Sequence, residues 1–206
     1  MSTETDIIDL LAGIEAGSPL DGIRGKRVQA RENAQVSYLT LFEPADFGDV
    51  SALERYAVAA FVAGVHGEPH VTAFYFNKLG DIARPEFVAA LKTEIGRGKT
   101  TGPYGAFPAG PLSVENKPGL IYRVAPDHQR ILGTKLAAAL EHAHLLVFRP
   151  RDAAPADMQA LLDASWTATG IVTLSQLVAF LSFQVRSVSG LRTLAASIEH
   201  QPSPAR

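Results

Sequence analysis

The segment HGEPH places two histidines and a carboxylate within five residues. His66, Glu68 and His70 are residue types that bind metals or transfer protons. A spacing of four presents two histidines to one metal when both lie on one helix. Gly67 and Pro69 lie between them, so we expect His66 in a break between two helices and His70 in the first turn of the second. One helical face would then not carry both. A metal site formed by Glu68 with one or both of His66 and His70 is therefore the less favoured interpretation.

Further along the same segment, Val71 and Tyr75 follow Glu68 at spacings of three and four, so the three residues share one helical face. A carboxylate and a phenol on one face can serve as acid and base. They can equally form a hydrogen-bonded pair that lines an interface. A carboxylate at position 68 would also be favourable next to the positive end of a helix, for dipole reasons alone.

The helix that must position this break has a clear start signal. Ser51 and Glu54 fit a capping box, which accounts for Glu54 without a catalytic role. After it, apolar residues recur every four positions and predict a buried stripe that runs to about Val65. They are Leu53, Ala57, Phe61 and Val65. Because proline is tolerated in the first turn, the second helix is expected to begin at residue 68 or 69.

The rest of the chain also has helical rather than alternating periodicity, which predicts an all-α protein. Further helices are expected over residues 6–14, 24–41, 85–95, 128–148, 155–164 and 173–188, with a last one starting near Gly190. A long segment rich in glycine and proline, residues 96–127, interrupts them. Loops of that length are usually functional or mobile, so this one is expected to cover a pocket.

Three other features of the sequence are expected to have structural rather than catalytic roles. The segment GRGKTTG, residues 96–102, lacks the first glycine and the preceding strand of a phosphate-binding loop. Trp166 is expected to pack in the core. Gln184 falls within the apolar stripe of its helix, so its amide must find a partner in a backbone group or in a neighbouring subunit.

Composition narrows the class of protein. The 206 residues are 47% hydrophobic and 19% charged, which predicts one packed folding unit, with a helical extension over 1–50 and a helical domain over 51–206. A net charge of −2 argues against nucleic-acid binding by phosphate neutralisation. No secretory signal and no apolar run of about 18 residues are seen, so we expect a cytoplasmic protein without a membrane partner. The absence of cysteine excludes disulfides, thiolate metal sites and thiol catalysis.

Two segments together resemble a known superfamily. ALERYAVAAFVAGVHGEPHVTAFYFNKL is similar to the core of the carboxymuconolactone decarboxylase/AhpD-like alkylhydroperoxidase superfamily. ALLDASWTATGIVTLSQLVAFLSFQVRSVSGL is similar to the closing helices of its longer, peroxidase-related members. The resemblance covers roughly residues 50–195. It implies an AhpD-like helical bundle that assembles as a homo-oligomer and needs no cofactor.

The residues at the positions that match the superfamily's active site exclude the reaction for which its peroxidases are known. Their cysteine pair falls on Glu68 and Val71, their relay histidine on Tyr75 and their relay glutamate on Tyr56. All four positions differ. Without a thiolate there is no nucleophile for a peroxide and no disulfide to cycle, so cysteine-dependent peroxidase activity is predicted to be absent.

We therefore expect a cysteine-free relative that binds or acts on a small organic molecule by acid–base chemistry. Glu68 would be the base or anionic anchor, Tyr75 and Tyr56 would donate hydrogen bonds, and His70 would transfer protons. The alternative is a non-catalytic assembly member, whose apolar stripes and 24–41 segment form subunit contacts. A metal-dependent enzyme using His66, Glu68 and His70 is the third possibility.

Overall fold

The computed structural model describes residues 5–199, so the outermost parts of the two predicted segments, 1–4 and 200–206, lie outside it. Within that range every regular element is a helix and there is no β-strand, which confirms the predicted all-α class. The helices are α1 (Ile7–Ala12), α2 (Pro19–Gly25), α3 (Val28–Phe42), α4 (Ala52–His66), α5 (Pro69–Gly80), α6 (Pro85–Gly98), α7 (Pro126–Leu132), α8 (Thr134–Phe148), α9 (Pro155–Asp163) and α10 (Ala168–Glu199). Two short 3-10 helices, η1 (Pro111–Glu115) and η2 (Pro150–Asp152), complete the described elements.

Helix α4 is the centre of the core, in contact with α5, α6, α8 and α10. It begins with the predicted capping box between Ser51 and Glu54. Its small residues let the neighbouring helices approach closely. A Cβ atom added at Gly64 would lie only 2.7 Å from the Ile95 side chain of α6, which shows how near the two helices come.

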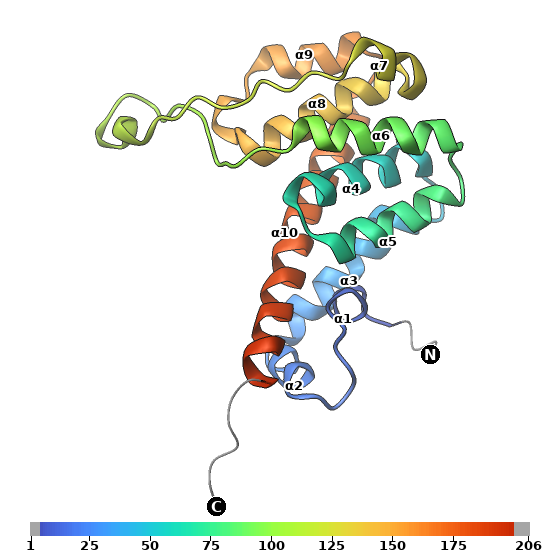
Figure 1. Ribbon diagram of the computed structural model, residues 1–206, viewed down its shortest axis with the longest axis vertical. Helices are drawn as coiled ribbons and strands as arrows, with labels where there is room; N and C mark the ends of the chain where they lie inside the picture. The colour runs from blue at the N-terminus through green and yellow to red at the C-terminus, as the bar shows by residue number, and fades with distance from the viewer. Residues whose placement is uncertain (1–4, 200–206) are drawn as a thin grey trace, which may run out of the picture.

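Helix α10 is a single helix, whereas the sequence predicted two with a boundary near Gly190. A glycine inside a helix costs about 1 kcal/mol relative to alanine, and packing elsewhere along the helix easily offsets that cost. Figure 1 shows α10 running along most of the molecule, with α1, α2 and α3 beside its C-terminal half. The N-terminal segment is thus packed on the same long helix as the rest of the chain.

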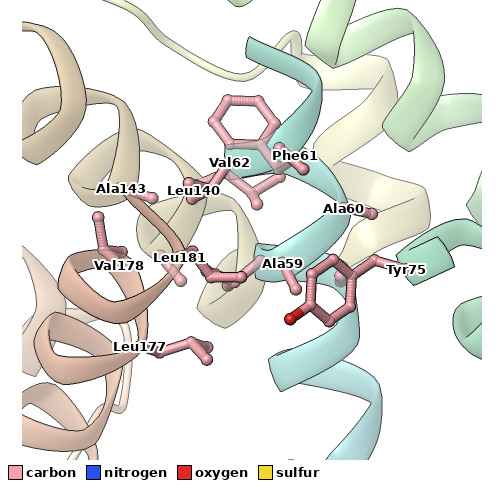
Figure 2. Close-up of a cluster of buried hydrophobic side chains, with 14 of the residues drawn as sticks. Ala59, Ala60, Phe61, Val62, Tyr75, Leu140, Ala143, Leu177, Val178 and Leu181 are labelled. Carbon is pink, nitrogen blue, oxygen red and sulfur yellow. The ribbon is translucent and has the colours of Figure 1, made fainter. Parts of the chain in front are cut away.

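Within residues 5–199, α10 is also the one unbroken helix that is long and apolar enough to cross a membrane, contrary to the expectation that no segment would pass this test. Half of its apolar window is buried inside the protein, and core helices pass the same test. Figure 2 shows Leu177, Val178 and Leu181 of α10 within a cluster that also contains side chains from α4, α5 and α8. Packing in this cluster accounts for the apolar composition of that part of the helix.

In the structure, each of two other predicted helices is divided into two. The 24–41 segment forms α2 and α3, and an ion-pair cluster ties both to α1: Arg24 contacts Asp6 and Asp9, while Arg31 contacts Asp9 and Asp21. The 128–148 segment forms α7 and α8, because Gly133 adopts φ +87° between them. A positive φ is accessible to glycine at little cost and turns the chain sharply there.

The predicted long loop is confined to residues 99–125, which we call the strap. It leaves the end of α6, extends away from the bundle, folds back through a bridge between Gly105 and Lys117, and returns to the start of α7 (Figure 1). Its returning end is buried: Tyr122 and Val124 belong to the hydrophobic core. The strap is therefore anchored at the point where it rejoins the helices.

Candidate functional site

The structure places the predicted break where the sequence indicated. His66 is the last residue of α4, Gly67 has φ +76°, and α5 begins at Pro69. His66 and His70 accordingly lie on different helices. No group of three His, Asp or Glu side chains in residues 5–199 is placed to hold a metal ion, so His66, Glu68 and His70 do not form such a group.

Glu68 acts as the N-cap of α5. Its carboxylate accepts a hydrogen bond from the Val71 backbone N–H at 2.5 Å, and its side chain is buried. Capping satisfies one of the free amides at a helix start and accounts for a carboxylate here without any catalytic role. His70, in the first turn of the same helix, is exposed.

Tyr75 is completely buried, and its hydroxyl donates to the Gln184 side-chain oxygen at 2.7 Å. Burial raises the pKa of this phenol well above its ordinary value, so it stays protonated. Figure 2 shows Tyr75 inside the hydrophobic cluster with its oxygen turned away from α5. Gln184 is buried as predicted, and its amide nitrogen has no partner within residues 5–199, so a neighbouring-subunit partner for that nitrogen stays a prediction. Its oxygen is bound by a side chain from within the same chain.

Tyr56 and Tyr75 both pack against the ring of Phe42. The Phe42 ring centroid is 5.4 Å from that of Tyr56 and 5.0 Å from that of Tyr75. The Tyr56 hydroxyl donates to the Phe42 carbonyl at 3.3 Å, and burial raises the pKa of this phenol. The two predicted phenols are thus brought together, and each is already engaged within the fold.

Glu68 does not join these phenols. It lies seven residues before Tyr75 on the same face of α5, which corresponds to a rise of about 10 Å along the helix axis. The shared face is confirmed by the burial of Glu68, Val71 and Tyr75. The four predicted residues Glu68, His70, Tyr75 and Tyr56 are therefore divided between a helix cap, an exposed position and an aromatic cluster.

The histidine nearest the break has a different setting. The His66 Nε2 atom lies 3.3 Å from the Ser182 hydroxyl of α10. Burial, with a contribution from the nearby Arg186 charge, lowers the pKa of His66 to about 4. At neutral pH this imidazole is uncharged.

A second group of titratable side chains surrounds a cavity between α8, α9 and the returning end of the strap. Its volume is about 70 Å³. The polar residues that line it are Tyr122, Arg123, Glu141, His142, His144, Arg149 and Asp157. In residues 5–199 only three buried side-chain nitrogen or oxygen atoms have no hydrogen-bond partner, and two of them, His142 Nδ1 and Arg149 Nε, belong to this lining.

The hydrogen bonds around His142 assign its tautomer. The Ser175 hydroxyl donates its one proton to the Ile171 carbonyl at 2.9 Å. Ser175 Oγ must then accept from His142 Nε2, which lies 3.4 Å away. Burial lowers the pKa of His142, so the ring is neutral at pH 7 and its Nδ1 atom is a free acceptor. The His142 side chain lines the cavity, and a neutral imidazole with a bare nitrogen is a candidate general base.

His144 is arranged in a similar way. Its Nε2 atom donates to the Gly98 carbonyl at 2.9 Å, because a carbonyl can only accept. Burial lowers the pKa of this imidazole as well. Its ring stacks on Tyr122 of the strap, with centroids 4.8 Å apart. Tyr122 and His144 thus form one wall of the cavity together.

This wall is held in place by a buried carboxylate. Glu94 is fully buried on α6 and accepts hydrogen bonds from the Tyr122 hydroxyl at 2.6 Å, from the Ala125 amide at 3.2 Å and from His128. Burial alone would raise the pKa of Glu94, but these bonds and the Arg97 charge lower it below its ordinary value. The ionised carboxylate therefore fixes the strap against α6 and α7.

The sequence interpretation missed this cavity, although the residues are visible in the segment EHAH. His142 and His144 are two residues apart, and on a helix such residues point in different directions. They line one cavity only because α9 and the strap close around α8, and neither contact can be read from spacing. Two histidines within an apolar helix were the one available signal.

No family model, curated protein or solved structure matches this chain. The AhpD-like bundle and the homo-oligomer remain predictions from the resemblance. The all-helical architecture and the geometry of the two sites carry the functional argument.

Proposed function

We propose that this cysteine-free chain binds a small organic molecule and acts on it by acid–base chemistry, with no thiol peroxidase step. The proposal keeps the function expected from the resemblance but moves its location. The helix joint, where the superfamily places its active site, holds a capping carboxylate. The cavity beside α8 holds neutral imidazoles.

One observation carries the proposal: the His142 Nδ1 atom is an unpaired acceptor in a side chain that is only 4% exposed and lines a cavity. A buried polar atom without a partner normally costs free energy, and such exceptions in folded proteins reflect local strain, a bound water or ion, or a catalytic role, of which the proposal takes the last. His142 would accept a proton from the bound molecule. Its Nε2–H, held by Ser175, keeps the ring in the required tautomer.

The test is a binding screen by ligand-observed NMR with a library of small oxygenated organic compounds. His142→Gln is the matched variant, because the glutamine amide can still donate to Ser175 while the basic nitrogen is lost. We expect compounds that bind the native protein and lose binding in the variant, with an unchanged melting temperature. Equal binding to both proteins, or no binding to either, would contradict the proposal.

The alternative function, a non-catalytic assembly member, is favoured by a different observation. A groove of about 400 Å³ between α2, α3 and the C-terminal half of α10 is lined by large exposed apolar residues. Ile23 is 41%, Phe183 47% and Leu194 38% exposed. Exposed apolar patches mark interaction surfaces, and a second copy of the chain is the partner that the resemblance implies.

A further inference from the structure

We propose that the far end of the strap docks in the apolar groove of a second copy of this chain. The docking segment, which we call the tip, is residues 108–116 and contains η1. This inference is independent of the acid–base function, and it names what fills the groove in the alternative assembly function. It follows from the exposure of the tip, its fixed shape, its charge and its distance from the groove of its own chain.

The tip presents apolar side chains that the rest of residues 5–199 leaves uncovered. Val114 is 90% and Leu112 is 52% exposed, and η1 has no buried residue. Figure 1 shows this end of the strap standing out from the helices, at the far left of the view. Apolar side chains gathered on a projecting segment mark a surface that a partner covers.

The tip is also held in a fixed shape. The Phe107 amide donates to the Asn116 side-chain oxygen at 2.7 Å, and the Gly110 amide donates to the Ser113 hydroxyl at 3.0 Å. The bridge between the two sides of the strap lies directly behind these bonds. A preformed segment loses less conformational entropy on binding than a flexible one. The shape of the tip therefore favours docking as a unit.

The groove combines an apolar lining with free positive charge. Four arginines contribute to its lining. Arg24 and Arg31 are paired with carboxylates of α1 and α2. Arg27 and Arg186 form no ion pair within residues 5–199. The groove therefore favours an apolar partner that also carries a carboxylate.

The tip has this composition. Glu115 is its one charged residue and follows Val114 in the sequence. Its carboxylate forms no ion pair with any other residue that the structure describes. The groove, at about 400 Å³, has room for the Leu112 and Val114 side chains, since a cavity of about 150 Å³ holds benzene. Charge and size thus match the tip to the groove.

The tip and the groove of one chain lie too far apart to meet. Figure 1 shows the tip to the side of the molecule near the level of α8, whereas α2 and the C-terminal half of α10 lie at the other end. A second copy must therefore supply the tip. Two copies related by a two-fold axis would each give one tip and receive one, so that both grooves are filled and the assembly closes.

Cross-linking between single cysteines tests the contact directly, because the chain has no cysteine of its own. Val114→Cys in the tip and Ser187→Cys in the groove lining would be purified separately, mixed and treated with a short bis-maleimide. We expect a covalent dimer whose mass shows one chain of each kind. The matched control replaces the tip variant with Val172→Cys, an exposed valine of α10 outside the groove lining, and should give only background product.

A charge swap tests the pairing of the tip with the arginines. Glu115→Arg should weaken self-association about tenfold, as measured by sedimentation. Reversing Arg27 and Arg186 together to glutamate should weaken it in the same way, and combining all three substitutions should restore it. Because no residue of η1 is buried, Glu115→Arg should leave the melting temperature unchanged.

The outcomes separate this proposal from the two functions. Cross-linking of the tip variant no better than the control, or self-association that Glu115→Arg leaves unchanged, would overturn the docking of the tip. If the native protein still sediments as a homo-oligomer, the assembly function survives that result. A native protein that is monomeric would overturn both the docking and the assembly function. The acid–base function uses neither surface and stands or falls on its own binding screen.

Discussion

At the residue scale, most of the polar side chains that the sequence singled out have structural tasks. Glu68 caps a helix, and Tyr75 and Tyr56 donate hydrogen bonds within the core. Of the three buried side-chain atoms without a partner in residues 5–199, two lie on His142 and Arg149 instead. Residue type alone did not distinguish these two groups, because capping, core pairing and catalysis use the same side chains.

The capping role of Glu68 predicts a modest stability effect. Replacing Glu68 with alanine leaves the Val71 amide without its partner and should lower the free energy of unfolding by about 1 kcal/mol. Glu68→Asp, which keeps a capping carboxylate, should be nearly neutral. Urea denaturation followed by circular dichroism measures both. A native-like Glu68→Ala protein that has lost ligand binding would instead place the active site at the helix joint.

The buried pair of Tyr75 and Gln184 predicts a non-additive pair of substitutions. Tyr75→Phe leaves the Gln184 side-chain oxygen without its donor, while the amide nitrogen already lacks a partner. The substitution should therefore lower the free energy of unfolding by about 1 to 3 kcal/mol. Adding Gln184→Leu removes the stranded group and should recover part of that loss. A double-mutant cycle by chemical denaturation tests this. Strictly additive effects would show that the pair does not interact.

Buried histidines predict a loss of stability in acid. Burial lowers the pKa of His66 to about 4, whereas the same group in the unfolded chain titrates near 6.5. Stability from this group is complete above pH 6.5 and is lost as the pH falls towards 4, because only the unfolded state takes up the proton. Denaturation midpoints between pH 7 and pH 4 should fall, and less steeply in His66→Gln. A midpoint independent of pH over this range would contradict the burial argument.

At the element scale, the fold shows which sequence signals are strong. The capping box of α4, the break after His66 and the proline start of α5 were predicted to within a residue or two, because local hydrogen bonding and steric rules determine them. The single α10 and the division at Gly133 were not, since tertiary packing decides whether a glycine interrupts a helix. The cavity depends on contacts between distant elements and could not be predicted at all.

The anchoring of the strap by Glu94 leads to a prediction at the element scale. Glu94→Gln replaces one accepting oxygen by an amide donor that faces Tyr122, the Ala125 amide or His128. The substitution should therefore lower the free energy of unfolding by about 2 to 3 kcal/mol. Hydrogen–deuterium exchange should rise in residues 122–132, where the strap joins α7, more than in α4. Exchange that rises equally everywhere would indicate global destabilisation, and unchanged exchange would show that Glu94 does not anchor the strap.

At the scale of the whole molecule, Figure 1 shows a long shape around α10, with α2 and α3 at one end and α8 and α9 at the other. The apolar groove is lined from the first pair of helices and the polar cavity from the second. If the groove is an interface between copies, native protein should sediment as a homo-oligomer. Phe183→Glu should then shift it towards the monomer without unfolding, because a charge at a buried apolar contact is costly. A native protein that sediments as a monomer at micromolar concentration would contradict the assembly.

The central claim is that the cavity beside α8 holds a small organic molecule, and native mass spectrometry of untagged protein tests it most directly. The protein would be gently purified from cells, alone and as His142→Gln. The account predicts a stoichiometric added mass on each native chain, released by acid and absent from the variant. Native chains with no added mass, or an added mass that His142→Gln retains, would contradict it.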